Sequence, residues 1–155
     1  MKESITINFY YSIGSRYSYL ASTQIDSLAR ETGCHVDWHP INSVRLIAQR
    51  EHNPFEGKPI SAQYEWIYRE LDAQRWAKLY KVPYVEPRGR VNFDSELLAR
   101  ACTAAKRLGK VEEYSHSLFA AMFSLRIRDD IRPSSFCMRP KLIRCRQTYF
   151  CRHLP

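Results

Sequence analysis

Residues 8 to 20 decide the fold of this chain: Asn8-Phe9-Tyr10-Tyr11-Ser12-Ile13-Gly14-Ser15-Arg16-Tyr17-Ser18-Tyr19-Leu20. The segment from Ile5 to Tyr11 is β-branched and aromatic, with apolar side chains at alternate positions, which predicts a strand. From Tyr17 onward, apolar residues recur at the spacing of one helical face until Gly33 ends the run, which predicts a helix. The turn between these elements is rich in serine and glycine, so we expect it to present its side chains at a helix N-terminus.

Ser15 is the residue of this turn with two open interpretations. Serine is a common N-cap, in which the hydroxyl oxygen accepts a hydrogen bond from the first turn of the helix. The same position faces unpaired backbone N–H groups and the positive end of the helix dipole, which suits a bound anion or thiolate. The residues alone therefore leave open whether Ser15 is a structural cap or a functional hydroxyl.

A second strand is predicted over residues 35–41, where Pro40 helps to end the alternation. A strand, a helix and a strand within about forty residues form a right-handed crossover unit, and such strands pair in parallel. The sequence therefore predicts an α/β fold with a β-α-β start.

Helices dominate the predicted structure that follows. A short helix is predicted over residues 43–48, a strongly periodic one over 61–80, one capped by Asp94, and one from Val111. The tyrosines and tryptophans of residues 61–80 are expected in the core rather than in a cofactor site. The breaker-rich loop at 52–59 is either a binding loop or a plain linker.

The net charge of +8 is concentrated at one end of the chain. Residues 126–155 hold eight Lys and Arg against two Asp, a balance of +6, which leaves +2 for the first 125 residues. A body so close to neutral argues against nucleic acid as a partner. No apolar run is long enough to cross a bilayer and the start lacks a signal segment, so we expect a cytoplasmic protein without a membrane partner; a homodimer stays open.

Cysteine and histidine spacing argues against metal and redox sites. No pair of cysteines has the Cys-x-x-Cys spacing of a zinc or redox site, so free thiols are expected and a disulfide oxidoreductase is disfavoured. The histidines show no paired spacing that indicates a metal site, so they are interpreted as surface or packing residues. These five are His35, His39, His52, His116 and His153.

Two motifs resemble one known family. The first is Phe9-Tyr10-Tyr11-Ser12-Ile13-Gly14-Ser15-Arg16-Tyr17-Ser18-Tyr19-Leu20-Ala21, and the second is Tyr68, Asp72 and Arg75-Trp76-Ala77 before Lys81-Val82-Pro83-Tyr84-Val85-Glu86-Pro87. Their order and content resemble the 2-hydroxychromene-2-carboxylate isomerases, which belong with the kappa-class glutathione transferases. The resemblance covers roughly residues 5 to 125.

This resemblance implies a site and an activity. It implies glutathione as cofactor and gives Ser15 the catalytic role of assisting the glutathione thiol, where a hydroxyl donor at a helix N-terminus favours thiolate over thiol. The implied reaction converts 2-hydroxychromene-2-carboxylate, a small aromatic substrate, into trans-o-hydroxybenzylidenepyruvate in aromatic catabolism. Arg16, Tyr17, Asn53 and Lys58 are expected near glutathione or the substrate carboxylate.

The domain organisation expected from the resemblance is a thioredoxin-like β-α-β start with an inserted helical domain over about residues 43–125. Members of the family then return to a second thioredoxin half with a cis-proline loop. Residues 126–155, rich in Cys, Arg and Pro, do not resemble that half, so the second half is expected to be missing through a frameshift or truncation. Arg16 also departs from the family, which usually has Pro there, and adds a cation suited to a carboxylate.

Three functions therefore remain in view. The first is a glutathione-dependent isomerase with Ser15 at the thiol. The second is a kappa-type glutathione transferase or peroxidase, since the same thiolate serves both reactions. The third is a non-catalytic, truncated remnant or a binding module with a basic tail.

Overall fold

The computed structural model describes residues 5–51, 65–88 and 91–124. It begins with strand β1 (Thr6–Tyr11), helix α1 (Arg16–Thr32) and strand β2 (His35–Pro40). The two strands pair in parallel, with Thr6 opposite His35 and Tyr11 opposite Pro40. This arrangement confirms the predicted β-α-β start.

Both ends of α1 follow from local sequence. At its start, the Ser15 hydroxyl oxygen accepts a hydrogen bond from the backbone N–H of Ser18 at 3.3 Å. At its end, Gly33 takes a left-handed conformation with φ of 68°, and its N–H donates to the carbonyl of Ala29. A glycine adopts this conformation without the steric cost that a Cβ brings, so the helix ends where the sequence predicts.

The remaining described elements are helical. They are α2 (Ser43–Ala48), α3 (Trp66–Tyr80), α4 (Ser95–Arg107), α5 (Val111–Phe119) and a π-helical turn, η1 (Ala120–Ser124). Asp94 caps α4 as predicted, because its carboxylate accepts from the N–H groups of Glu96 and Leu97. The predicted helix at 61–80 begins later among the described residues, at Trp66, and residues 61–64 lie outside them.

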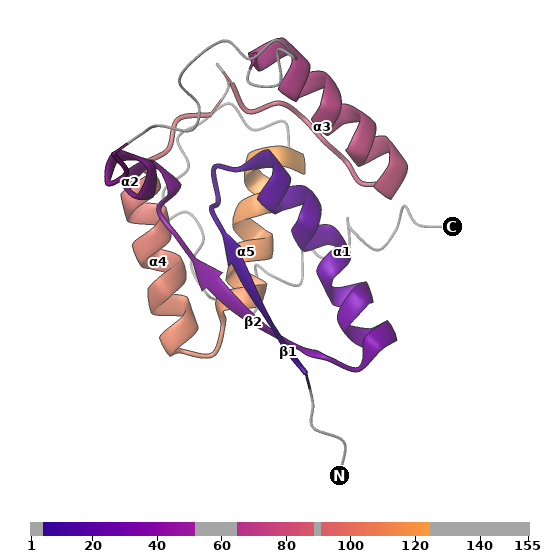
Figure 1. Ribbon diagram of the computed structural model, residues 1–155, viewed down its shortest axis with the longest axis vertical. Coiled ribbons are helices and arrows are strands. Elements are labelled where there is room, and N and C mark those ends of the chain that lie inside the picture. The colour runs from indigo at the N-terminus through magenta and orange to yellow at the C-terminus, as the bar shows by residue number, and fades with distance from the viewer. Residues whose placement is uncertain (1–4, 52–64, 89–90, 125–155) are drawn as a thin grey trace.

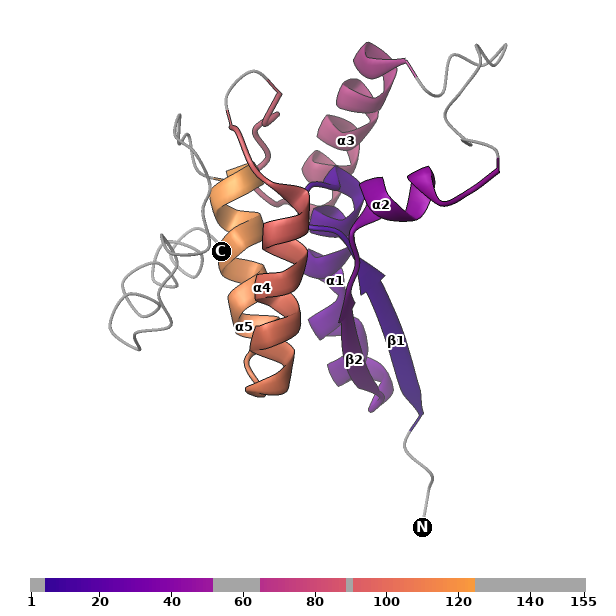
Figure 2. The same cartoon turned by 90° about the vertical axis from the view of Figure 1, so that its left-hand side faces the viewer.

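The helices pack on one side of the two strands. In Figure 1, β1 and β2 lie side by side with α1 along one edge and α4 along the other. Figure 2, turned by 90°, shows α4 beside α5, and α1, α4 and α5 on the same side of the strands. The opposite face carries exposed side chains such as Tyr10, which is 62% exposed and stacks on His39.

Aromatic side chains fill the space between the sheet and the helices. Tyr11 and Trp38 meet edge to face with ring centroids 5.3 Å apart, and Phe119 of α5 lies 5.8 Å from Tyr11. Tyr19 of α1 stacks on Phe123 of η1 at 5.1 Å. All five side chains are buried. The core therefore connects the two elements that flank the turn, β1 and α1, to α5 and η1.

The buried side of α3 differs from the sequence prediction. Of the aromatic residues expected in the core, Tyr80 packs against it, but Trp66, Tyr68 and Trp76 are 37%, 44% and 41% exposed. The buried positions are Ala73 and Ala77. Their small side chains allow α3 to approach α1 closely, and α1 is its main neighbour among the described elements. Periodicity identified the helix but did not show which side packs.

No helix in the described ranges is both long and apolar enough to cross a membrane.

A buried polar cluster links β1, α4 and α5. The Tyr11 hydroxyl hydrogen-bonds to the Ser115 hydroxyl at 2.5 Å, and the Ser115 hydroxyl donates to the Cys102 sulfur at 3.8 Å. Cys102 is fully buried, and this burial raises the pKa of its thiol from 9.0 to about 11. The folded protein therefore holds the thiol proton more tightly than the unfolded chain does.

We expect alkaline pH to destabilise the protein through Cys102. The stabilisation is complete below pH 9, where both states keep the proton, and is lost as the pH rises to about 11. A shift of this size corresponds to about 3 kcal/mol. Guanidinium unfolding under reducing conditions between pH 8 and 11 measures it. Cys102→Ala is the control. Its free energy of unfolding should be lower than that of the unchanged chain at pH 8 but should fall less between pH 9 and 11. If the free energies of the two proteins fall in parallel with pH, Cys102 is not the cause of the loss.

Candidate functional site

The N-terminus of α1 presents a hydroxyl with an available proton. Ser15 is half-buried, and its oxygen accepts from the N–H of Ser18, which uses a lone pair and leaves the hydroxyl proton free to donate. Within residues 5–51, 65–88 and 91–124, no acceptor of that proton is recorded. The N–H groups of Arg16 and Tyr17 also lack intrahelical acceptors, as in the first turn of any α-helix. This end of a 17-residue helix therefore favours negative charge.

A cavity of about 130 Å³ lies beside this turn. The residues on either side of Ser15 in sequence, Gly14 and Arg16, both line it. Its other walls come from the start of α3, the segment after α3 and the end of the described chain: Trp66, Glu86, Pro87, Arg88, Val91, Phe93 and Phe123. The cavity thus combines aromatic surface with two guanidinium groups next to the helix N-terminus.

Arg16, Glu86 and Trp66 form the charged wall of the cavity. Arg16 is buried, and its Nη1 lies 3.3 Å from Oε2 of Glu86. The guanidinium also lies over the ring of Trp66, 4.3 Å from the centroid, and the guanidinium of Arg88 lies 4.6 Å from the same centroid. Such cation–π contacts fix the orientation of both groups. Tyr84 donates to Glu86 at 2.6 Å, and its pKa is raised, first by burial and then by this hydrogen bond.

Arg16 retains hydrogen-bonding capacity toward a ligand. Its Nη2 donates to Oε1 of Glu86 at 3.5 Å, whereas its buried Nη1, although close to Glu86, has no hydrogen-bond partner among the described residues. An unsatisfied buried donor is costly, commonly by about 1–3 kcal/mol and more for a charged group. A carboxylate in the cavity would satisfy this donor, because an arginine can bind carboxylate oxygens through two parallel N–H groups.

The ring of Phe93 lies close against Gly14. A Cβ at position 14 would lie 2.7 Å from the Phe93 ring, which is shorter than any ordinary van der Waals contact. The absence of a side chain at Gly14 therefore lets an aromatic ring lie against the turn that carries Ser15.

The predicted site residues fall into three groups. Ser15 and Arg16 lie at or beside the cavity. Tyr17 is 37% exposed and its hydroxyl donates to Asp72 of α3 at 2.8 Å, so it connects two helices; its pKa is raised, first by partial burial and then by Asp72. Asn53 and Lys58 lie outside the described residues.

Sequence reasoning missed most of the cavity. Trp66, Glu86, Arg88 and Phe93 were not identified as site residues, since they come from separate segments with no shared spacing. Arg16, next to Ser15, was the signal that the sequence offered. A buried arginine needs a carboxylate partner, and Glu86, in the motif after α3, is that partner in the structure.

Comparison with known proteins identifies the family of this chain. The model of the DSBA-like thioredoxin domain matches residues 6–135, which extends ten residues beyond the boundary that composition suggests at 125. The chain is 25% identical over 139 residues to the 2-hydroxychromene-2-carboxylate isomerase of Pseudomonas sp. strain C18, covering 89% of this chain and 63% of the relative. It is 34% identical over 83 residues to that of Sphingobium xenophagum, covering 53% of this chain and 41% of the relative.

Two further comparisons agree. The chain is 26% identical over 137 residues to the 2-hydroxychromene-2-carboxylate isomerase of Pseudomonas putida, covering 88% of this chain and 64% of the relative. A solved structure of a 2-hydroxychromene-2-carboxylate isomerase matches with a TM-score of 0.65 and 22% identity, over 93% of this chain and 66% of that chain. The chain thus spans less than two thirds of the length of these curated relatives. It belongs to the DSBA-like thioredoxin domain family, as a distant homologue of the 2-hydroxychromene-2-carboxylate isomerases.

Proposed function

We propose that this chain is a glutathione-dependent isomerase that converts 2-hydroxychromene-2-carboxylate into trans-o-hydroxybenzylidenepyruvate. The observation that carries the proposal is the Ser15 hydroxyl, with an available proton, at the N-terminus of α1 and between two residues that line a cavity. The names of the relatives supply the substrate and the class of reaction, an isomerisation, while the product and glutathione come from the family resemblance.

Ser15 and the first turn of α1 would stabilise a sulfur anion. A hydroxyl proton and a helix dipole each favour thiolate over thiol by about 1–2 kcal/mol, which corresponds to about one pKa unit apiece. Glutathione would supply that sulfur, which as a thiolate can add reversibly to a conjugated double bond and so allow rotation about it. Ser15 is then a hydrogen-bond donor to sulfur and not a covalent nucleophile.

The cavity suits the two chemical parts of the substrate. The rings of Trp66 and Phe93 provide apolar and aromatic surface for a fused bicyclic ring. The unsatisfied Nη1 of Arg16 provides a donor for the carboxylate, either that of the substrate or one of those of glutathione. Arg16 and Arg88 bring two positive charges to this wall against the one negative charge of Glu86, so one further carboxylate would make the wall neutral.

Two measurements on the full chain test the proposal. Isothermal titration with reduced glutathione measures binding, and absorbance spectroscopy follows the conversion of 2-hydroxychromene-2-carboxylate with and without glutathione. We expect saturable binding and a glutathione-dependent rate above that of heat-inactivated chain.

The result also separates the three functions. Formation of the open isomer with glutathione recovered unchanged supports the isomerase. A stable glutathione thioether of an electrophile, without isomerisation, would assign a transferase instead. Absence of glutathione binding would refute both enzymatic functions for this chain.

A further inference from the structure

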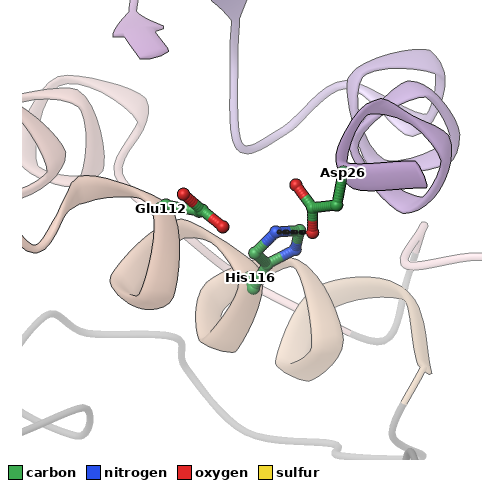
Figure 3. Close-up of side chains that lie close together, drawn as sticks. All are labelled: Asp26, Glu112 and His116. Carbon is green, nitrogen blue, oxygen red and sulfur yellow. Dashed lines mark ion pairs between the residues drawn. The ribbon is translucent and has the colours of Figure 1, made fainter. Parts of the chain in front are cut away.

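Three side chains able to bind a metal ion meet between α1 and α5. Figure 3 shows Asp26 of α1 directed toward His116 of α5, with the carboxylate of Glu112 beside them on α5. One ligand atom from each residue lies within 4.8 Å of the other two. Asp26 is ten residues along α1 from Arg16, which corresponds to ~15 Å of helix, so this cluster is separate from the cavity at Ser15.

The spacing of Glu112 and His116 suits a helical metal site. Residues four apart on an α-helix lie on the same face, one turn above the other, so both side chains can reach a common point. Asp26 reaches that point from the facing helix. Two ligands from one helix and a third from its neighbour give a three-ligand site that leaves positions for water.

His116 is held in position with an unsatisfied nitrogen. Its ring meets the ring of Trp38 edge to face, with centroids 5.0 Å apart. Its Nε2 is buried and lies 3.3 Å from Oδ2 of Asp26, yet it has no hydrogen-bond partner within residues 5–51, 65–88 and 91–124. The ion-pair distance alone therefore does not satisfy this nitrogen, and a cation bound between Nε2 and the carboxylates would do so.

The charges of the cluster also favour a cation. Asp26 and Glu112 bring two carboxylates close to one imidazole. Among the described residues, the ion pair recorded for Asp26 is the one with His116, and none is recorded for Glu112. Two carboxylates in proximity repel each other, and a divalent ion removes that repulsion.

We propose that Asp26, Glu112 and His116 form a binding site for a divalent first-row transition metal ion of the zinc and cobalt class. One imidazole nitrogen and two carboxylate oxygens suit these ions, whereas Mg²⁺ and Ca²⁺ prefer ligand sets made of oxygen alone. The sequence prediction of no metal site at the histidines differs from this proposal, because the Glu112–His116 spacing is a weak signal alone and Asp26 joins it only in the folded chain.

A metal ion at this site would join α1 to α5. Binding to the folded but not the unfolded chain raises the midpoint of thermal unfolding, by an amount that grows with the concentration of free metal. The ion would thus hold α1, whose N-cap is Ser15, against α5.

Cobalt titration of the full, metal-free chain tests the proposal. Co²⁺ bound by carboxylate and imidazole absorbs weakly in the visible range, whereas thiolate ligation adds an intense charge-transfer band in the near ultraviolet. This distinction separates the proposed site from the five cysteines of the chain. We expect one Co²⁺ per chain, without the charge-transfer band, and a higher midpoint of thermal unfolding.

Glu112→Gln is the decisive variant, because Glu112 is exposed and no ion pair is recorded for it within the described part of the chain. We expect at least a 10-fold loss of Co²⁺ affinity. The matched control is Glu113→Gln, which removes the same charge one residue away, on a side chain that pairs with Lys110 and not with the cluster. Equal affinities in the two variants, a charge-transfer band at one equivalent, or no binding would each overturn the proposal.

Discussion

Replacing Ser15 with alanine is expected to lower the glutathione-dependent isomerisation rate by about 10²-fold or more, in line with the loss of one preorganised donor. The hydroxyl proton of Ser15 has no recorded acceptor among the described residues, so it is available to a bound sulfur anion. Steady-state kinetics with saturating glutathione measure the effect. A rate equal to that of the unchanged chain would remove Ser15 from the mechanism.

Two control variants separate the catalytic role of Ser15 from its role as N-cap. Ser15→Thr keeps both the cap and the donor, so it should retain much of the rate. Ser15→Asp keeps a good cap but has no proton to donate when ionised, and its charge opposes a thiolate. We expect Ser15→Asp to be as stable as the unchanged chain within about 1 kcal/mol and to be inactive. If it were active, the cap alone would explain why serine is present.

The β-α-β start could be predicted because its signals are local. Alternation defines β1, the cap at Ser15 and the left-handed glycine at Gly33 define the ends of α1, and the crossover rule makes β2 parallel to β1. Each of these features depends on residues within a few positions of one another. The same holds for the cap at Asp94, which accepts from the two residues after Ser95.

The site could be predicted only in part, because most of it is assembled by tertiary packing. Ser15 was found from its place in a turn, but Trp66 and Glu86 reach Arg16 from positions at least fifty residues away. The buried side of α3 shows the same limit, since periodicity cannot tell that Ala73 and Ala77 are buried while Trp66, Tyr68 and Trp76 stay partly exposed.

Glu86→Gln is expected to destabilise the protein by about 3–5 kcal/mol, because it leaves the charge of Arg16 buried without its carboxylate. Arg16 is 6% exposed and Glu86 is 12% exposed, so water compensates little. Chemical unfolding measures the change. Glu113→Gln breaks an exposed pair with Lys110 on α5, and its cost should stay below about 1 kcal/mol.

The double variant Arg16→Met and Glu86→Gln shows whether the pair itself causes the loss. Without the guanidinium no buried charge is left unpaired. The double variant should therefore be more stable than Glu86→Gln alone, so that the second substitution recovers stability and does not add a further loss. If the double variant loses at least as much stability as Arg16→Met and Glu86→Gln lose in sum, Arg16 does not depend on Glu86.

The Glu86→Gln variant also reports on function. If Arg16 binds a carboxylate, reduced glutathione or the chromene carboxylate should raise the unfolding midpoint of Glu86→Gln more than that of the unchanged chain, because the ligand then replaces the missing partner.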